Sequence, residues 1–436
     1  MINKYPQHEQ MKIDEVFIEN FKGIDSLRFE PKLLNVIVGR NNTGKTSILE
    51  ALAIAIDPNF IRRNYSEFPS SIINYLANSS RITVSFSNKR RSTNDVLIEK
   101  ADAQVIVDKM ANLVLENIKG FQAELGKPSI SSRYLLKRFR LLSDFARDDI
   151  AKFQESIQTV LADQLTPEII KRLSQESVAI NVGNDENVFV GEEFRSYQER
   201  LTLAVLGNLY KSISSADKDL LRRIVLSSRY RNTTILPADK NNKQKRGPEI
   251  VYVKEPMKYL ERTLDKEQGT QELALKIEEI LKRDKIVPNL IRFDFTEVVF
   301  ETVQGRKSVE FHRMGEGFQT LVAVLSILRS IENPQTIFLI EEPEVHMHPG
   351  YVNELVKYLV QLSASLNVQL FITTHSYDLI QSLTEGDYNS DMKEYLQDNL
   401  LLLRLTRVDD SVIGESIFYK EALSNISKLQ LDLRGI

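Results

Sequence analysis

Eight residues near the amino terminus have the types and spacing of a phosphate-binding loop. Residues 39–46 read GRNNTGKT and fit the pattern G-x-x-x-x-G-K-[ST]. The backbone N–H groups of such a loop, together with the start of the helix after it, attract phosphate oxygens, and the lysine adds a positive charge. The hydroxyl of Thr46 is also expected to bind Mg²⁺. The residues that we expect to contact the phosphates are Gly39, Asn41, Asn42, Thr43, Gly44, Lys45, Thr46 and Ser47.

The segments on both sides of this loop are those that the motif requires. The apolar run at 34–38 predicts a buried strand before the loop, and apolar residues recur with helical spacing between 48 and 56. The alternative is a glycine-rich turn that carries a lysine by chance. The flanking strand and helix favour the phosphate-binding interpretation.

A second group of polar residues completes a candidate site for ATP hydrolysis, which needs an acid near Mg²⁺ and a positioned water. The apolar run at 336–340 predicts a buried parallel strand, and it ends in Glu341 and Glu342. We expect Glu341 to bind Mg²⁺ and Glu342 to polarise the attacking water, with Lys45 as a further catalytic residue. Alternatively, both carboxylates open a helix, where they suit the helix dipole.

Two further motifs suit the binding of a γ-phosphate. The apolar run at 368–372 ends in TTHS, so His375 lies at the carboxyl end of a strand, where ligands of α/β sheets bind. We expect His375 to sense the γ-phosphate, although a single histidine is often only a hydrogen-bonded polar residue. Gly315 and Gly317 open a helix whose N–H groups suit an anion.

The composition excludes several classes of function. The 436 residues contain no cysteine, so disulfides, zinc–thiolate sites and thiol catalysis are excluded. No apolar run approaches the roughly 20 residues of a membrane span, and the first residues carry no apolar secretory segment. We therefore expect a cytoplasmic protein without a membrane partner. The net charge of −3 confines any contact with nucleic acid to local patches.

Three sections follow one another along the chain. Residues 1–104 carry strand patterns around the phosphate-binding loop, and residues 105–289 carry mainly helical spacing interrupted by proline and glycine. Strand character returns at 291–300 and 308–311, and the remainder of residues 290–436 alternates between strand and helix. We therefore predict an α/β head that is split by a large, mainly helical insertion.

The order of these motifs resembles the ABC-type ATPase heads of the SMC, RecF and overcoming-lysogenization-defect (OLD) families. The acidic strand continues as IEEPEVHMHP, which is similar to the EEPE-x-H-x-HP segment of OLD ATPases, and residues 19–23, ENFKG, resemble their opening segment. The resemblance covers about residues 1–100 and 290–430. It implies an ABC-type P-loop ATPase head, with a mixed sheet plus an antiparallel β-subdomain, that binds ATP and Mg²⁺. It also implies that Lys22 lies near the nucleotide.

The same resemblance implies a nucleotide-sandwich dimer or a higher homo-oligomer. Gly315 and Gly317 of one subunit would then complete the γ-phosphate site of the other. The chain departs from the broader ABC pattern at Gly315, where serine is common, and at Glu341, where aspartate is common, so hydrolysis is not expected to be fast. His346 and His348 have the spacing of a metal pair, but the flanking prolines favour a loop, which the resemblance places at the dimer interface.

OLD nucleases carry a Toprim domain after the ATPase head, but only 61 residues follow His375 in this chain. A Toprim fold of about 100 residues does not fit there, so the chain is expected not to cut nucleic acid itself. The resemblance then favours the ATPase of a two-component antiphage defence system, similar to PARIS and Septu, that controls a separate nuclease or toxin. The alternatives are a RecF-like ATPase that binds DNA during repair and a nucleotide-gated scaffold without turnover.

Three basic stretches are candidates for contact with DNA. Residues 133–140 hold four positive residues and no acid, and residues 221–246 hold eight positive residues and one acid. Residues 87–91 form a smaller cluster. These stretches either neutralise DNA phosphates, with strong salt dependence, or form a solvated face or a surface that docks a partner protein.

Overall fold

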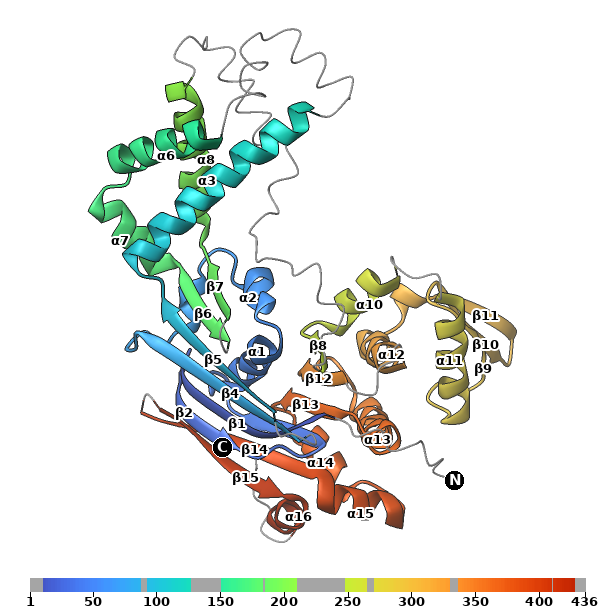
Figure 1. Cartoon of the computed structure of the whole chain (residues 1–436). Helices are drawn as coiled ribbons and strands as arrows, with labels where there is room; N and C mark the ends of the chain where they lie inside the picture. Colours follow the sequence, from blue (N-terminus) through green and yellow to red (C-terminus); the bar gives the residue numbers. More distant parts are fainter. Residues whose placement is uncertain are drawn as a thin grey trace. The chain divides into compact units, whose positions relative to one another are not determined.

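The computed structural model describes residues 11–87, 92–126, 150–182, 185–209, 248–264, 270–329, 336–409 and 411–427 (Figure 1). The chain divides into two compact units. The first unit combines residues 1–57, 81–95 and 246–436, and the second combines residues 58–80 and 96–245. Each unit has its own apolar core.

A six-stranded sheet organises the first unit. Its strands run in the order β15-β14-β3-β13-β12-β8, and all neighbouring pairs are parallel except β14 and β15. The strands are β3 (Leu34–Gly39), β8 (Glu249–Val253), β12 (Thr336–Glu341), β13 (Gln369–Thr374), β14 (Leu400–Val408) and β15 (Ser411–Phe418). Every residue of β3 and β13 is buried, as expected for parallel strands with both faces covered. Because β3, β12 and β13 are parallel, their carboxyl ends lie at the same end of the sheet.

Helices from distant parts of the chain share one core with this sheet. The helix α1 (Lys45–Ile56) follows β3 directly and packs against β3, β12 and β13 with buried residues that are not part of this core. The other helices of the first unit are α10 (Pro256–Leu264), α11 (Thr270–Arg283), α12 (Glu316–Arg329), α13 (Pro349–Leu366), α14 (Tyr377–Glu385), α15 (Ser390–Asn399) and α16 (Tyr419–Ser427). The sequence pattern predicted that residues 249–283 belong to the helical insertion. They belong to the first unit because β8 pairs with β12 and because α10 and α11 pack against α12.

An antiparallel sheet stands beside the parallel one. The first four of its six strands are, in order, β2 (Ile24–Phe29), β1 (Lys12–Phe21), β4 (Ser79–Ser87) and β5 (Ser92–Lys100). The buried side chain of Gln369 joins the two sheets, because it accepts from the Ile13 N–H and donates to the carbonyls of Ile13 and Lys32. Within the parallel sheet, buried Asn35 of β3 donates to the carbonyl of Leu370 on β13 and to that of Lys32, just before β3. These paired amides satisfy polar groups that would otherwise be costly to bury.

A smaller antiparallel sheet contains β9 (Leu290–Phe293), β10 (Glu297–Thr302) and β11 (Gly305–Glu310). The sequence suggested continuous strand character at 291–300, but the structure breaks this run into two strands. Asp294 causes the break, because its carboxylate accepts hydrogen bonds from the N–H groups of Thr296 and Glu297. Such side-chain bonds to nearby backbone favour turns over ladders.

The second unit is mainly helical. Its helices are α2 (Asn59–Asn64), the 3₁₀ turn η1 (Pro69–Ile72), α3 (Ala103–Gly126), α6 (Ile150–Gln164), α7 (Pro167–Glu176) and α8 (Glu192–Leu209). A hairpin of β6 (Val178–Val182) and β7 (Asp185–Phe189), absent from the sequence expectations, pairs with the end of β5. Apolar side chains of α3, α6 and α8 form the core of this unit, with Phe153 and Phe194 fully buried.

These elements confirm the predicted α/β fold with a mixed sheet, an antiparallel β-subdomain and a large helical part. Within the part of the chain that the structure describes, no helix combines the length and the apolar character needed to cross a membrane. The basic stretches at 133–140 and 221–246 lie outside the described residues, as does most of the cluster at 87–91.

Candidate nucleotide site

The loop at 39–46 joins β3 to α1 in a conformation that depends on two glycines. A side chain at Gly39 would place its Cβ only 2.7 Å from the Leu405 carbonyl and from the Thr43 hydroxyl. Gly44 caps α1 with a left-handed φ of 88°, a conformation that glycine adopts without strain. Asn42 is also left-handed, at φ 64°. The loop therefore turns tightly at the amino end of α1, where backbone N–H groups suit phosphate oxygens.

Lys45 lies folded over this loop. Its Nζ donates to the Gly39 carbonyl at 2.9 Å and to the Arg40 carbonyl at 3.0 Å, and only 6% of the residue is exposed. Burial lowers the pKa of Lys45, and the negative charges of Glu342 and Glu344 oppose that shift. A phosphate entering the loop would replace two neutral carbonyls with charged oxygens, which bind an ammonium group more strongly.

Thr46 meets Glu341 at the end of β12. The Thr46 hydroxyl donates to one carboxylate oxygen at 3.4 Å, and the hydroxyl of Tyr252 on β8 donates to the other. Burial raises the pKa of Glu341, with Glu50 adding to the shift, while Tyr252, Lys254 and Thr46 oppose it. A hydroxyl and a carboxylate beside a phosphate loop fit Mg²⁺, which usually takes a few protein oxygens together with phosphates and water.

Glu342 and His375 form a pair at the same end of the sheet. The Oε1 of Glu342 lies 3.1 Å from Nδ1 of His375, and the two side chains are 33% and 50% exposed. Glu342 has a left-handed φ of 39°, and its N–H donates to the Thr373 carbonyl at 3.0 Å. A carboxylate that is oriented by an imidazole and open to solvent has the arrangement of a group that activates water.

The structure thus brings Lys45, Thr46, Glu341, Glu342 and His375 to one end of the central sheet. Their roles in binding and catalysis stay predictions. Asn41 and Asn42 are exposed on the loop, Thr43 is buried, and Ser47 follows in the first turn of α1. Lys22, at the turn between β1 and β2, forms an ion pair with Glu50 of α1.

Gly315 and Gly317 lie at the start of α12, beside the loop that follows Glu342. A Cβ on Gly317 would approach the His346 carbonyl to 2.7 Å, so only glycine fits there. A Cβ at Gly315 would meet no atom of the described chain within 4 Å other than those of its two chain neighbours. The two glycines therefore differ. Gly317 allows the start of α12 to pack closely against the loop at His346, whereas Gly315 is exposed.

His346 and His348 lie in a loop, as the flanking prolines indicated. His346 approaches Glu316 at 3.7 Å, whereas His348 caps α13 by accepting a hydrogen bond from the Gly350 N–H at 3.2 Å. No group of three or more histidine, aspartate or glutamate residues among those described is arranged to hold a metal ion.

Three residues of the site neighbourhood were not identified from sequence. Tyr252 comes from a strand far along the chain, and no local pattern marks it as a partner of Glu341. Arg407, at the tip of β14, donates to the Asn42 carbonyl at 3.4 Å. Glu344 is buried behind Glu342 and bonds to Thr374. Its place in the EEPE segment was the available signal.

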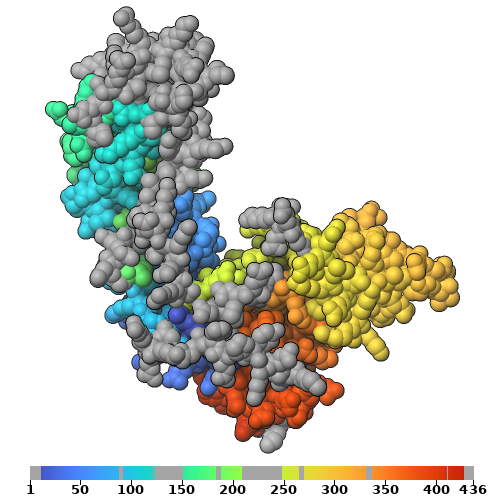
Figure 2. Space-filling view, turned by 45° about the vertical axis from the view of Figure 1, so that its right-hand side comes forward, coloured from blue at the N-terminus to red at the C-terminus, as the bar shows by residue number. Residues whose placement is uncertain are grey.

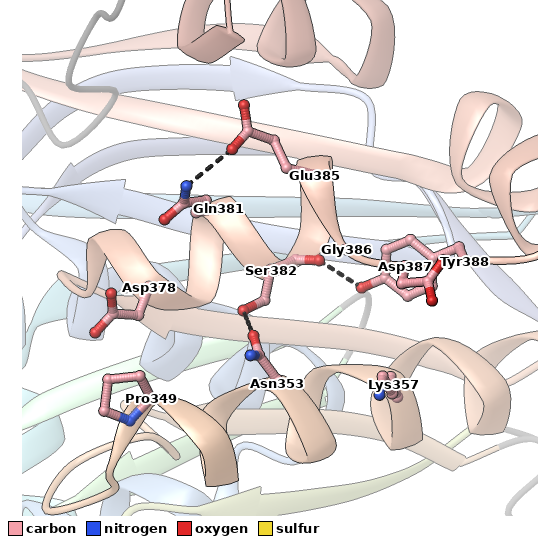
Figure 3. A pocket seen from close by; sticks show the side chains of 10 residues that line it. All are labelled: Pro349, Asn353, Lys357, Asp378, Gln381, Ser382, Glu385, Gly386, Asp387 and Tyr388. Carbon is pink, nitrogen blue, oxygen red and sulfur yellow. Dashed lines mark hydrogen bonds between the residues drawn. The ribbon is translucent and has the colours of Figure 1, made fainter.

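A separate concavity of about 390 Å³ lies between α13 and α14 (Figure 3). Its walls carry mainly polar and charged side chains, and the hydroxyl of Ser382 bonds to Asn353 across it. The lining residues are Pro349, Asn353, Lys357, Asp378, Gln381, Ser382, Glu385, Gly386, Asp387 and Tyr388. None of them belongs to the nucleotide loop or to the Glu342–His375 pair.

A known protein family and one curated protein each match most of the chain. A family model described as AAA ATPase domain matches residues 11–380. Endonuclease GajA of Bacillus cereus is 23% identical over 383 residues, which are 80% of this chain and 52% of GajA. The DNA replication and repair protein RecF of a Marinomonas species is 28% identical over 137 residues, 29% of this chain and 37% of RecF. The chain thus spans about half the length of GajA.

Solved structures of SMC heads also align with nearly the whole chain. The SMC head domain of Thermotoga maritima has a TM-score of 0.42 at 10% identity and covers 93% of this chain and 99% of that one. An SMC head bound to the C-winged helix domain of ScpA has a TM-score of 0.44 at 11% identity, with coverages of 94% and 99%. Because the family model matches far more than half of its residues, this chain belongs to the AAA ATPase domain family.

Proposed function

We propose that this chain binds ATP with Mg²⁺ and hydrolyses it. The observation that carries the proposal is the meeting of the P-loop with two carboxylates and a histidine at one end of the sheet. Thr46 contacts Glu341, and Glu342 contacts His375. Membership of an ATPase domain family supports the same activity.

Each residue has a distinct part in this proposal. The loop N–H groups and Lys45 hold the β- and γ-phosphates, and Thr46 and Glu341 hold Mg²⁺, which neutralises charge on the phosphates. Glu342 accepts a proton from the attacking water while His375 keeps the carboxylate in place. His375 can also donate to a γ-phosphate oxygen, so it links the presence of that phosphate to the position of Glu342.

Replacement of Lys45 by alanine tests the nucleotide site. Loss of a buried ammonium that contacts phosphate should weaken ATP binding by about 100-fold or more, measured by titration calorimetry. The matched control is Lys276→Ala, which removes an exposed lysine on α11 and should bind ATP like the wild type. Tight ATP binding by the Lys45 variant would contradict the proposed site.

We also propose that two copies of the chain sandwich the nucleotides between them. The exposed position of Gly315 supports this arrangement, because in the described part of the chain a Cβ at this helix start would meet no atom within 4 Å beyond its two chain neighbours, which leaves room for a second copy. The amino end of α12 would then face the γ-phosphate that is held by the P-loop of the partner subunit.

A bulky substitution at Gly315 tests the sandwich. Gly315→Arg should fold normally, since the φ of Gly315 is not positive and a Cβ there would meet no described atom within 4 Å beyond its two chain neighbours. It should nevertheless block ATP-dependent dimerisation, measured by light scattering after gel filtration with ATP. Normal dimerisation of the Gly315 variant would rule out a sandwich through this surface.

The biological role that we propose is control of a nuclease or toxin in antiphage defence. The similarity to an endonuclease over 80% of this chain supports a link to nucleic-acid cleavage. We expect the chain to co-purify with the product of a neighbouring reading frame and to leave DNA uncut without it. Cleavage of DNA by the purified chain alone would overturn this division of labour.

A RecF-like role in DNA repair is the second candidate, supported by the similarity to RecF over 137 residues. It predicts ATP-dependent binding of duplex DNA with a steep salt slope. Neutralising Lys243, Lys245 and Arg246 should flatten that slope. Absence of ATP-dependent DNA binding at low salt would leave the defence role as the better candidate.

A further inference from the structure

Glu344 is a buried carboxylate behind the Glu342–His375 pair. Only 6% of the residue is exposed. The hydroxyl of Thr374 donates to Oε1, but Oε2 is buried without a hydrogen-bond partner in the described part of the chain. Charged groups from three elements face it: Lys45 of α1, Glu342 of its own loop and His375 after β13. A carboxylate in this state does not serve stability, because an unsatisfied buried oxygen is unfavourable.

The contact between Glu344 and Thr374 joins the two segments that carry the pair. Thr374 ends β13, and its hydroxyl also accepts a hydrogen bond at 2.9 Å from the N–H of Ser376. His375 lies between these two residues, so its backbone is fixed from both sides. On the other segment, Glu342 and His346 have left-handed φ values of 39° and 66°. Strained residues of this kind persist only where surrounding contacts hold them.

We propose that Glu344 is a positioning residue for ATP hydrolysis, which holds Glu342 and His375 in register through its bond to Thr374. The inference rests on the proposed function, because it concerns the hydrolysis step of the same site. It predicts that breaking the bond lowers turnover and leaves ATP binding intact, since the P-loop makes no part of this contact.

Two pairs of variants test the bond from both ends. Thr374→Val removes the hydroxyl at nearly constant volume, whereas Thr374→Ser keeps it. Glu344→Met removes the acceptor, whereas Glu344→Gln keeps one. A small displacement of reacting groups can reduce rates by about 10- to 100-fold. We therefore expect kcat to fall by about that factor in the valine and methionine variants, with KM near the wild-type value, and to fall less in the serine and glutamine variants.

The double variant Thr374→Val with Glu344→Met separates this bond from general damage. If the two residues act through one bond, the double variant should be no slower than the slower single variant. Thermal unfolding checks that each protein is folded. Turnover in Thr374→Val equal to that in Thr374→Ser, or equal losses in Glu344→Gln and Glu344→Met, would overturn the inference alone. A wild-type chain that binds ATP without turnover would overturn the proposed function as well.

Discussion

The strand-end site of the first unit and the helical core of the second unit are built on opposite principles. At the site, Lys45 and Glu344 are buried charges, and Asn42, Glu342 and His346 have left-handed backbones. The helical core contains apolar side chains in ordinary helices. At its edge, Thr166 caps α7 in the usual way, ahead of a proline in the first turn.

This difference has an energetic meaning. Burial of charge and left-handed backbone both oppose folding, so residues that need them at the site serve chemistry. Burial of apolar side chains drives folding, so the helical core serves stability. Substitutions at the site should therefore change turnover more than stability, and substitutions in the helical core should do the reverse.

Glu342→Gln should give the largest effect, and it tests whether a substitution at the site changes turnover more than stability. Loss of the carboxylate that accepts a proton should reduce kcat by about 10²- to 10⁴-fold, while ATP binding and the unfolding temperature change little. The ATP-bound dimer should accumulate, and light scattering after incubation with ATP measures it.

Glu272→Gln is the matched control for that experiment, because it alters an exposed glutamate of α11. It should hydrolyse ATP at the wild-type rate. If Glu342→Gln also kept the wild-type rate, another group would have to activate the water. The claim that the residues at this site serve catalysis would then be wrong for Glu342.

Phe194→Ala tests whether a substitution in the helical core changes stability more than turnover. Phe194 is fully buried in the helical core, and truncation of such a phenylalanine typically destabilises by about 3–5 kcal/mol. Thermal unfolding should show the loss, while ATP affinity and kcat at low temperature stay unchanged. Phe68→Ala is the control: Phe68 is 56% exposed, and its loss should matter by no more than about 0.5 kcal/mol. Weakened ATP binding in a folded Phe194 variant would show that the two units do not divide their tasks.

The sequence predicted those parts of the molecule that are determined by residues close together in the chain. The buried runs that became β3, β12 and β13 carry their functional residues at their carboxyl ends, so P-loop and carboxylates were expected at one end of a sheet. The break between β9 and β10 also has a local cause, since Asp294 bonds to the backbone of Thr296. The apolar residues on both sides of Asp294 nevertheless led to the prediction of one continuous strand.

Contacts between distant segments were beyond what the sequence pattern determines. Tyr252 reaches Glu341 because β8 adds to the edge of the parallel sheet, and the short run of β8 gives no sign of its neighbour. Lys22 was expected near the nucleotide by resemblance, and its ion pair with Glu50 appears only when β1 and α1 pack together.

Glu344→Gln gives the smallest expected effect and tests whether the site opposes stability. Burial raises the pKa of Glu344 above its ordinary value of 4.5, with Glu342 adding to the shift while Thr374 and His375 oppose it. The folded state therefore binds this proton more tightly than the unfolded state, so stability falls as the pH rises through the folded pKa.

The Glu344→Gln variant lacks this loss of stability at high pH. Its unfolding temperature should exceed that of the wild type at neutral pH, and the difference should shrink toward pH 4.5. Glu341, whose pKa is also raised by burial, is present in both proteins, so the difference between them reports Glu344 alone. A variant less stable than the wild type at neutral pH would mean that the ionised carboxylate stabilises the fold, and the contrast with the helical core would then fail at this residue.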